Sequence, residues 1–183
     1  MLSVDIESSE LQPREAPAVT ESSLPNLDYF VPNVDDHKAL IRHMRKKCGW
    51  DATKVPLWFE QQIEGRRFMV VFCLPGSQTP IGMGGVELED FAQQDKQVAD
   101  PEEKRGCVVS LFLYRDHRGQ GYLGRMLRIC EEIGRAKGLK ELTLYGLSKA
   151  GGYVRFGYEV FKVEDRHYGR DGVMKTTFLK KRL

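Results

Sequence analysis

The sequence predicts an α/β fold in which a mixed sheet of about seven strands carries helices on both faces. Two observations lead to this prediction. Apolar runs of strand length and amphipathic stretches of helical length follow one another in the order β-α-α-β-β-β-α-β-α-β-β, with glycine or proline near many junctions. The chain has 183 residues, of which 41% are hydrophobic and 30% charged, so a single domain can bury a full core.

Residues 1–27 are expected to form a flexible tail before a single domain over 28–183. The tail is rich in Ser, Glu and Pro and poor in aromatic residues, so it cannot bury enough apolar surface to offset the entropy of ordering. The elements expected next are a short strand at 28–34, a helix over 37–47 capped by Asp35 or Asp36, a helix over 54–63, strands over 66–76 and 80–90, and a polar loop over 91–105.

In the second half, a β-prone apolar run over 107–114 leads into an amphipathic helix. This helix is expected over 121–138, because apolar residues recur on one face and charged residues on the other. The remaining elements are a strand over 141–147, a short helix around 150–156, and an antiparallel pair of strands over 158–163 and 173–179 joined by the polar turn 164–172.

Charge and composition exclude several classes of protein. The formal net charge of +2 predicts no strong attraction to nucleic acid or to an anionic membrane. The sequence has no run of about 18 apolar residues, and its acidic N-terminus resembles neither a secretory signal nor a transit peptide. The four cysteines are widely spaced and form no CxxC pair, so a reduced, cytoplasmic setting is expected and no metal site is predicted.

The turn before the helix at 121–138 has the composition of an anion site. Arg118-Gly119-Gln120-Gly121 joins a strand to a helix, so free backbone N–H groups and the positive end of the helix face one loop. The glycines allow an anion to approach the backbone closely, and Arg118 can add charge-assisted hydrogen bonds to phosphate. The sequence therefore predicts a ligand that carries phosphate at this turn.

The spacing Gly119-x-Gly121-x-x-Gly124 also matches the fingerprint of dinucleotide-binding Rossmann domains. That fingerprint requires an acidic residue at the end of the next strand, about 20 residues further on. Here the strand ends in the acid-free segment 145–148, and too little sequence follows for the remaining βαβ units. A Rossmann oxidoreductase is therefore disfavoured.

The same segment resembles the acyl-CoA motif of the GNAT superfamily of N-acetyltransferases, Arg/Gln-x-x-Gly-x-Gly/Ala, which follows the fourth strand in that family. The residues from Arg118 to Tyr122 match the motif by position. Leu123 stands where the family prefers Gly or Ala, and Gly124 follows one place late.

A second match lies downstream, where the family has a tyrosine in a short helix and then a Gly-aromatic pair. These are Tyr153 and Gly157-Tyr158 here, and the resemblance covers about residues 28–183. It implies the GNAT fold, with a mostly antiparallel central sheet, and acetyl-CoA as co-substrate. The resemblance implies that acetyl-CoA contacts the main chain of Leu111, Phe112 and Leu113 and the loop residues Arg118, Gly119, Gln120, Gly121, Tyr122, Leu123 and Gly124.

The implied reaction is transfer of acetyl from acetyl-CoA to a primary amine of a small molecule, by direct attack of the amine on the thioester in a ternary complex. Tyr153 matches the family's general acid, which protonates the sulfur of CoA. Some members carry a glutamate base eleven residues before the motif arginine, but this position is Cys107 here. The candidates left for the base are Glu87 and Glu89, which are expected to share one face of the strand over 80–90, and His167.

The sequence leaves the acceptor open. Residues 87–103 contain seven acidic side chains and one basic side chain, so a loop that overhangs the site would favour a cationic acceptor, although a solvated loop is the plainer interpretation. Trp50 and Trp58 lie where the family shapes its acceptor pocket. Acetylation of protein N-termini or lysines and non-catalytic binding of acyl-CoA remain as alternatives. The oligomeric state is also open, a homodimer included.

Overall fold

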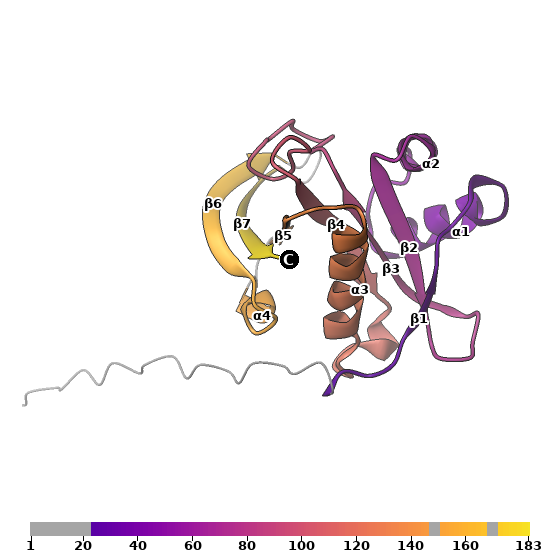
Figure 1. Ribbon diagram of the computed structural model, residues 1–183. Coiled ribbons are helices and arrows are strands. Elements are labelled where there is room, and N and C mark those ends of the chain that lie inside the picture. The colour runs from indigo at the N-terminus through magenta and orange to yellow at the C-terminus, as the bar shows by residue number, and fades with distance from the viewer. Residues whose placement is uncertain (1–22, 147–150, 168–171) are drawn as a thin grey trace, which may run out of the picture.

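The structure of the protein, a computed structural model, describes residues 23–146, 151–167 and 172–183 (Figure 1). The strands in these residues are β1 (Asp28–Phe30), β2 (Arg67–Cys73), β3 (Pro80–Glu87), β4 (Arg105–Leu113), β5 (Glu141–Gly146), β6 (Glu159–His167) and β7 (Val173–Arg182). The helices are α1 (Val34–Lys47), α2 (Val55–Ile63), α3 (Tyr122–Ala136) and α4 (Gly151–Val154), and the short 3-10 helix η2 covers Arg115–His117.

The strands form one mixed sheet in the order β1-β2-β3-β4-β5-β7-β6. The β4–β5 pair is parallel, and the other neighbouring strands of the sheet are antiparallel. The predicted α/β class, with seven strands in a mostly antiparallel sheet, is therefore confirmed.

Helices cover both faces of the sheet, as predicted (Figure 1). The alternation of side chains along β2 shows how the faces differ: Val70 and Phe72 belong to the core that includes α3, whereas Met69 and Val71 belong to the core under α1 and α2. Within the described part of the chain, no helix is both long enough and apolar enough to cross a lipid bilayer.

The helix α1 begins earlier than predicted. Its N-cap is Asn33, whose side chain accepts a hydrogen bond from the backbone N–H of Asp36 at 2.8 Å. The predicted caps, Asp35 and Asp36, lie inside the first turn, where acidic side chains interact favourably with the positive end of the helix. The prediction of the cap was wrong because three residues in this short stretch can all perform this role.

The C-terminal hairpin is longer than predicted. Strand β6 continues through His167, so the first four residues of the predicted turn over 164–172 are strand, and residues 168–171 lie outside the described residues. The side chain of Arg166 is 4% exposed and pairs with Asp95 at 2.7 Å and with Asp90 at 3.6 Å. These partners lie about 70 residues away in the sequence, so the local composition alone indicated a turn.

The polar loop before β4 packs on the sheet and does not project from it. Val98 and Ala99 are buried in a third cluster with Cys107, Val109 and Phe178. This loop therefore covers part of the sheet face beside α1 and α2.

The packed part of the chain begins before Asp28. Leu27 is buried in the core that includes α3, and Leu24 packs against the same core. Most of the predicted tail, residues 1–22, lies outside the described residues.

Candidate functional site

Strands β4 and β5 begin as neighbours and then part. Their parallel pairing ends at Cys107 and Thr143, although β4 continues to Leu113 and stays paired with β3 on its other side. Within the described residues, the edge of β4 from Val108 onward is therefore not paired with β5. An open strand edge of this kind can bind an extended ligand through main-chain hydrogen bonds.

A β-bulge lies in the open part of β4. Ser110 and Leu111 lie opposite a single residue of β3, Gly84. The φ of Ser110 is 55°, in the left-handed region that residues other than glycine rarely adopt. The Oγ of Ser110 accepts a hydrogen bond from Nη1 of Arg45 at 3.3 Å, so this strained position connects the open edge to α1.

The turn after β4 has the geometry of an anion site. Gly119 and Gly121 have φ values of 77° and 84°, which glycine adopts without steric cost. Helix α3 starts directly after Gly121, so its first N–H groups and its positive end face the loop. The side chain of Arg118 is exposed, and its Nε donates to the carbonyl oxygen of Leu113 at 3.0 Å. The predicted loop therefore lies beside the open end of β4.

The N-terminal segment covers one flank of this loop. A Cβ added to Gly121 would lie 3.2 Å from Pro25, and one added to Gly124 would lie 2.6 Å from Leu24 and 2.7 Å from Phe156. Gly124 is buried at these contacts, so it allows close packing between α3, Phe156 just after α4, and the N-terminal segment. Nothing lies within 4 Å of the corresponding position at Gly119, where the loop is open.

A buried ionic network connects α3 to the chain that follows α4. Nζ of Lys181, on β7, donates to Oε1 of Glu131 at 2.7 Å and to the carbonyl oxygen of Phe156 at 2.9 Å. Glu131 is completely buried and also pairs with Arg128 at 2.8 Å. The network therefore fixes the spacing between α3 and the α4 region.

Tyr153 lies on α4, next to the end of β5. A Cβ added to Gly146 would lie 3.9 Å from Cε2 of Tyr153, whose ring packs against the core that includes α3. Burial raises the pKa of the Tyr153 phenol. The phenol therefore stays protonated at neutral pH, in the state from which it can donate a proton.

The two predicted carboxylates, Glu87 and Glu89, do not share a face. Strand β3 ends at Glu87, so the alternation on which that prediction rested does not reach Glu89. Glu87 is 4% exposed and forms an ion pair with Arg67, whereas Glu89 is half-exposed and lies 3.7 Å from Arg66. Of the two, only Glu87 has the surroundings of a functional carboxylate.

Glu87 lies directly opposite Cys107 in the β3–β4 register. The Glu87 carboxylate, on the neighbouring strand, is therefore adjacent to Cys107, the position at which some GNAT members carry a glutamate base. Burial raises the pKa of Glu87 to about 7, against the opposing effect of the Arg67 guanidinium. Such a carboxyl group exchanges its proton near neutral pH.

The other residues considered for chemistry are less suited to it. Cys107 is completely buried, and burial raises the pKa of its thiol, so it remains protonated and serves as a core side chain. His167 is exposed at the end of β6. In the parts of the chain that the structure describes, no three His, Cys, Asp or Glu side chains are grouped to hold a metal ion.

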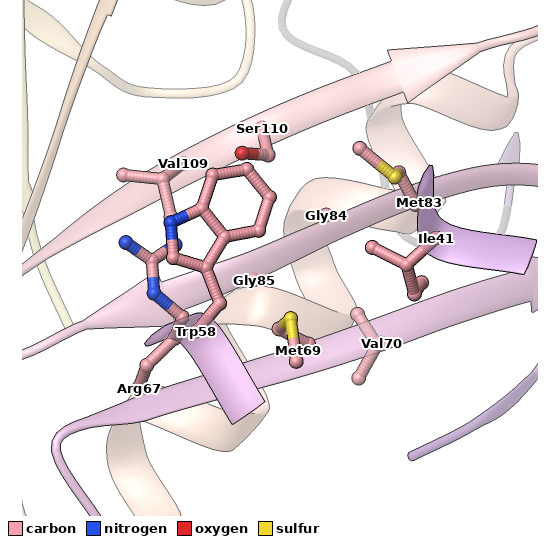
Figure 2. A pocket seen from close by; sticks show the side chains of 10 residues that line it. All are labelled: Ile41, Trp58, Arg67, Met69, Val70, Met83, Gly84, Gly85, Val109 and Ser110. Carbon is pink, nitrogen blue, oxygen red and sulfur yellow. The ribbon is translucent and has the colours of Figure 1, made fainter. Parts of the chain in front are cut away.

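A pocket lies between the two N-terminal helices and the sheet, on the α1 side of the bulge (Figure 2). Figure 2 shows the indole of Trp58 beside the guanidinium of Arg67, with Val109 and Ser110 of β4 above them in the view. The residues that line the pocket are Ile41, Trp58, Arg67, Met69, Val70, Met83, Gly84, Gly85, Val109 and Ser110.

Three carboxylates of the acidic segment have partners outside the site. Asp90 accepts hydrogen bonds from backbone N–H groups of its own loop, and Asp95 pairs with Lys162 at 3.0 Å. Glu102 pairs with Lys96 at 3.3 Å. A cationic acceptor attracted by this segment stays a prediction.

Sequence reasoning did not identify Arg45 or Arg67 as residues of the site. One signal for Arg67 is available in the sequence, because an arginine two residues before Met69 lies on an inward-facing position of an apolar strand. Ser110 is likewise a polar residue inside the apolar run over 107–114, which is where the bulge occurs.

Comparisons with known proteins agree with this geometry. The sequence profile described as the acetyltransferase (GNAT) family matches residues 37–158. No curated protein has a matching sequence.

Solved structures share the fold at low sequence identity. The protein yncA from Salmonella typhimurium, solved with its cofactor acetyl-CoA, matches with a TM-score of 0.63 at 16% identity, over 86% of this chain and 94% of that chain. An N-acetyltransferase from Staphylococcus aureus matches with a TM-score of 0.62 at 13% identity, over 86% and 98% of the two chains. A chain of the NatC complex bound to Gag peptide and CoA matches with a TM-score of 0.62 at 13% identity, over 86% and 99%.

Proposed function

Because the chain belongs to the acetyltransferase (GNAT) family, we propose that it transfers acetyl from acetyl-CoA to a primary amine of a small molecule. The observation that carries this proposal is the parting of β4 from β5 after Cys107 and Thr143, directly beside the loop that starts at Arg118. The same fold is solved with acetyl-CoA in the Salmonella protein and with CoA in the NatC complex.

The residues present suit a CoA thioester. Backbone N–H groups at the start of α3 and the guanidinium of Arg118 are donors for the pyrophosphate, and the space beside Gly119 is open. The main chain of Leu111 to Leu113 offers an open edge for the amides of the pantetheine arm. Acetyl-CoA supplies the activated acetyl group when it is bound.

Glu87 is our candidate for the general base. A free alkyl amine is almost entirely protonated at pH 7, so a proton must leave before its nitrogen can attack. A carboxylate with a pKa near 7 can accept this proton, directly or through a water molecule. Arg67 holds Glu87 in place and is itself oriented by Gln61, whose side-chain oxygen accepts from its Nε at 2.9 Å.

Tyr153 is our candidate for the general acid. As the new N–C bond forms and the C–S bond breaks, the departing sulfur takes the bonding electron pair and requires a proton. The protonated phenol of Tyr153 next to the end of β5 can supply it, and solvent can then return a proton to the phenolate.

The pocket beside the bulge supports a small acceptor. Its walls come from α1, α2 and three neighbouring strands, so it is a local hollow and not a groove along the surface (Figure 2). The hollow has a free volume of about 10 Å³, so an acceptor that enters it must move the side chains of these walls. An acceptor for extended peptide would need a longer open groove.

The test is release of free thiol from acetyl-CoA by the purified protein, measured against a panel of amines, amino acids, polyamines, amino sugars and peptides. We expect acceptor-dependent release with at least one class of small molecule and a mass increase of one acetyl group in the product. Release with peptides alone would favour a protein acceptor. Binding of acetyl-CoA without turnover of any acceptor would favour a non-catalytic binding module.

A further inference from the structure

Arg45 is held between two indole rings, and one of these, Trp58, lines the pocket. Its guanidinium carbon lies 4.4 Å from the ring centre of Trp58 and 4.9 Å from that of Trp50. Its Nε and Nη2 both donate to the carbonyl oxygen of Asp51, at 3.0 and 2.9 Å, and its Nη1 donates to Ser110. The planar group is therefore fixed by stacking and hydrogen bonds before any ligand is bound.

Among the described residues, no carboxylate forms an ion pair with this guanidinium, although the Asp51 carboxylate is near enough to favour its charge. Among the residues that the structure describes, Arg45 has no acidic side chain within ion-pair distance, and the Asp51 carboxylate instead accepts hydrogen bonds from Thr53. Partial burial lowers the pKa of Arg45 to about 10, which still leaves the group cationic at neutral pH. A partly desolvated cation that has no ion-pair partner can bind an anion.

A second cation lies on the same indole. The guanidinium carbon of Arg67 is 4.8 Å from the ring centre of Trp58, and Glu87 is its ion-pair partner. Two guanidinium groups therefore lie over one indole, and Glu87 pairs with the guanidinium of Arg67. An anionic ligand beside Arg45 would relieve the repulsion between the two cations.

The free donors of Arg45 lie next to the open strand. Its Nε–Nη2 edge is used by Asp51, so the edge formed by Nη1 and Nη2 keeps donors for a two-point contact with a carboxylate. Because Nη1 also contacts Ser110, this edge is adjacent to the bulge of β4. Under the proposed function, the thioester would lie along this part of β4.

We infer that the acceptor is an α-amino acid whose carboxylate binds Arg45, which makes Arg45 the residue that selects the substrate class. This inference rests on the proposed function and adds to it. The amine of an α-amino acid is attached to the carbon next to its carboxylate, so a carboxylate on Arg45 brings the nucleophile to the bulge. A flat carboxylate also suits a site between two indoles better than a tetrahedral phosphate does.

The side chain of the acceptor should be uncharged. Beyond Trp58, Arg67 and Ser110, the pocket is lined by apolar side chains and glycines, including Ile41, Met69, Met83 and Val109 (Figure 2). Its free volume is about 10 Å³, so the side chain of the acceptor would have to displace part of this apolar wall. A charged side chain placed there would lose its hydration without gaining a partner. We therefore expect leucine or phenylalanine to be better acceptors than lysine or glutamate.

The experiment compares matched acceptors in the thiol-release assay with the full chain and saturating acetyl-CoA. The two sets are L-leucine, L-leucinamide and isopentylamine, and L-phenylalanine, L-phenylalaninamide and phenethylamine. We expect kcat/KM for the amino acids to exceed that for the amides and the simple amines by about 10- to 100-fold, the effect of losing a charged hydrogen-bonded contact. Preference for the amides or simple amines, or equal rates, would overturn the inference while leaving the proposed function in place.

Variants test whether Arg45 is responsible. Arg45→Gln should remove the preference for the carboxylate by lowering kcat/KM for the amino acids alone, and Arg45→Lys should restore part of it. Arg42→Gln is the matched control, because Arg42 is an exposed residue one turn earlier on α1. Circular dichroism and the acetyl-CoA dissociation constant identify any variant that has lost its fold. An equal loss of rate for all three acceptors in Arg45→Gln would contradict a selective role.

A binding measurement separates this inference from turnover. Trp50 and Trp58 flank Arg45, so their fluorescence should change when L-leucine binds in the presence of CoA, and should not change with isopentylamine. Absence of thiol release together with this fluorescence response would overturn the proposed function but support the carboxylate site. Absence of both would overturn the inference as well.

Discussion

Arg118 donates a hydrogen bond from its Nε to the carbonyl oxygen of Leu113 at 3.0 Å, and so joins the glycine loop to the free end of β4. Two parts of the site are connected by this contact: the donors at the start of α3 and the open strand edge. The remaining N–H groups of the Arg118 guanidinium are on an exposed side chain, available to a phosphate.

Replacement of Arg118 by alanine should weaken the binding of CoA by about 10- to 100-fold, since one charge-assisted contact to phosphate is lost. The dissociation constant is measured by isothermal titration calorimetry. Arg115→Ala, an exposed arginine on η2, is the control for a general change in surface charge. An unchanged dissociation constant in Arg118→Ala would remove the loop from the CoA site.

Replacement of Tyr153 by phenylalanine should lower kcat by about 100-fold while leaving the dissociation constant of acetyl-CoA nearly unchanged. The ring still packs against the core, and only the proton donor is removed. Steady-state kinetics with the best acceptor provide the measurement, and Val154→Ala, an exposed neighbour on α4, controls for disturbance of the short helix. Wild-type turnover in Tyr153→Phe would exclude the phenol as the acid.

Glu87 should be responsible for the rise of kcat/KM with pH around neutrality. Its pKa of about 7 means that the carboxylate able to accept a proton becomes populated as the pH increases through this value. Glu87→Gln should lower kcat/KM and abolish this limb of the pH profile. Glu89→Gln alters a half-exposed carboxylate past the end of β3, so it should leave both the rate and the profile intact.

The same carboxyl group should make stability depend on pH. The pKa of Glu87 is about 7 in the folded protein and 4.5 ordinarily, so the folded state binds the proton more tightly. Proton binding by Glu87 therefore stabilises the folded state by on the order of 3 kcal/mol. This stabilisation is complete below about pH 4.5 and is lost as the pH rises through about 7. Urea unfolding of the wild type and of Glu87→Gln at several pH values measures it. If the wild type gained free energy of unfolding relative to Glu87→Gln as the pH rises, the predicted direction of this pH dependence would be wrong.

Glu131 should be the most costly carboxylate to remove. It is completely buried and pairs with Lys181 and Arg128, so Glu131→Ala leaves these cations without a partner and should lower the free energy of unfolding by about 3–5 kcal/mol. Glu132→Ala is the control, because that side chain is half-exposed and its pair with Arg125 at 3.7 Å should contribute about 1 kcal/mol or less. Similar unfolding midpoints for the two variants would show that the network adds little.

The features predicted from sequence are those encoded by neighbouring residues. The glycine loop and α3 are predictable because both depend on neighbouring residues. Gly121 adopts the left-handed conformation that ends the loop, and the apolar periodicity of α3 starts directly after it. The sheet class followed from the order of the elements, and the place of Tyr153 beside β5 followed from the resemblance.

The features that sequence reasoning missed depend on residues far apart in the chain. Arg166 keeps β6 extended through an otherwise turn-like stretch, because Asp90 and Asp95 reach it from a different loop. Arg45 and Arg67 come together on Trp58 only when α1, α2 and β2 have packed. No local pattern specifies such contacts, and the alternation assumed for Glu89 failed because strand ends are set by pairing as well as by composition.

Leu24, near the start of the described chain, packs beside the glycine loop that begins at Arg118. It fills the space next to Gly124 and Phe156. By thermodynamic linkage, a ligand that shifts the loop must also change how firmly this segment is held, and the reverse is equally true. Truncation or tagging near Leu24 should therefore change the affinity of the loop for its ligand. The rate at which a protease cleaves near Leu24 should likewise change when a ligand binds to the loop.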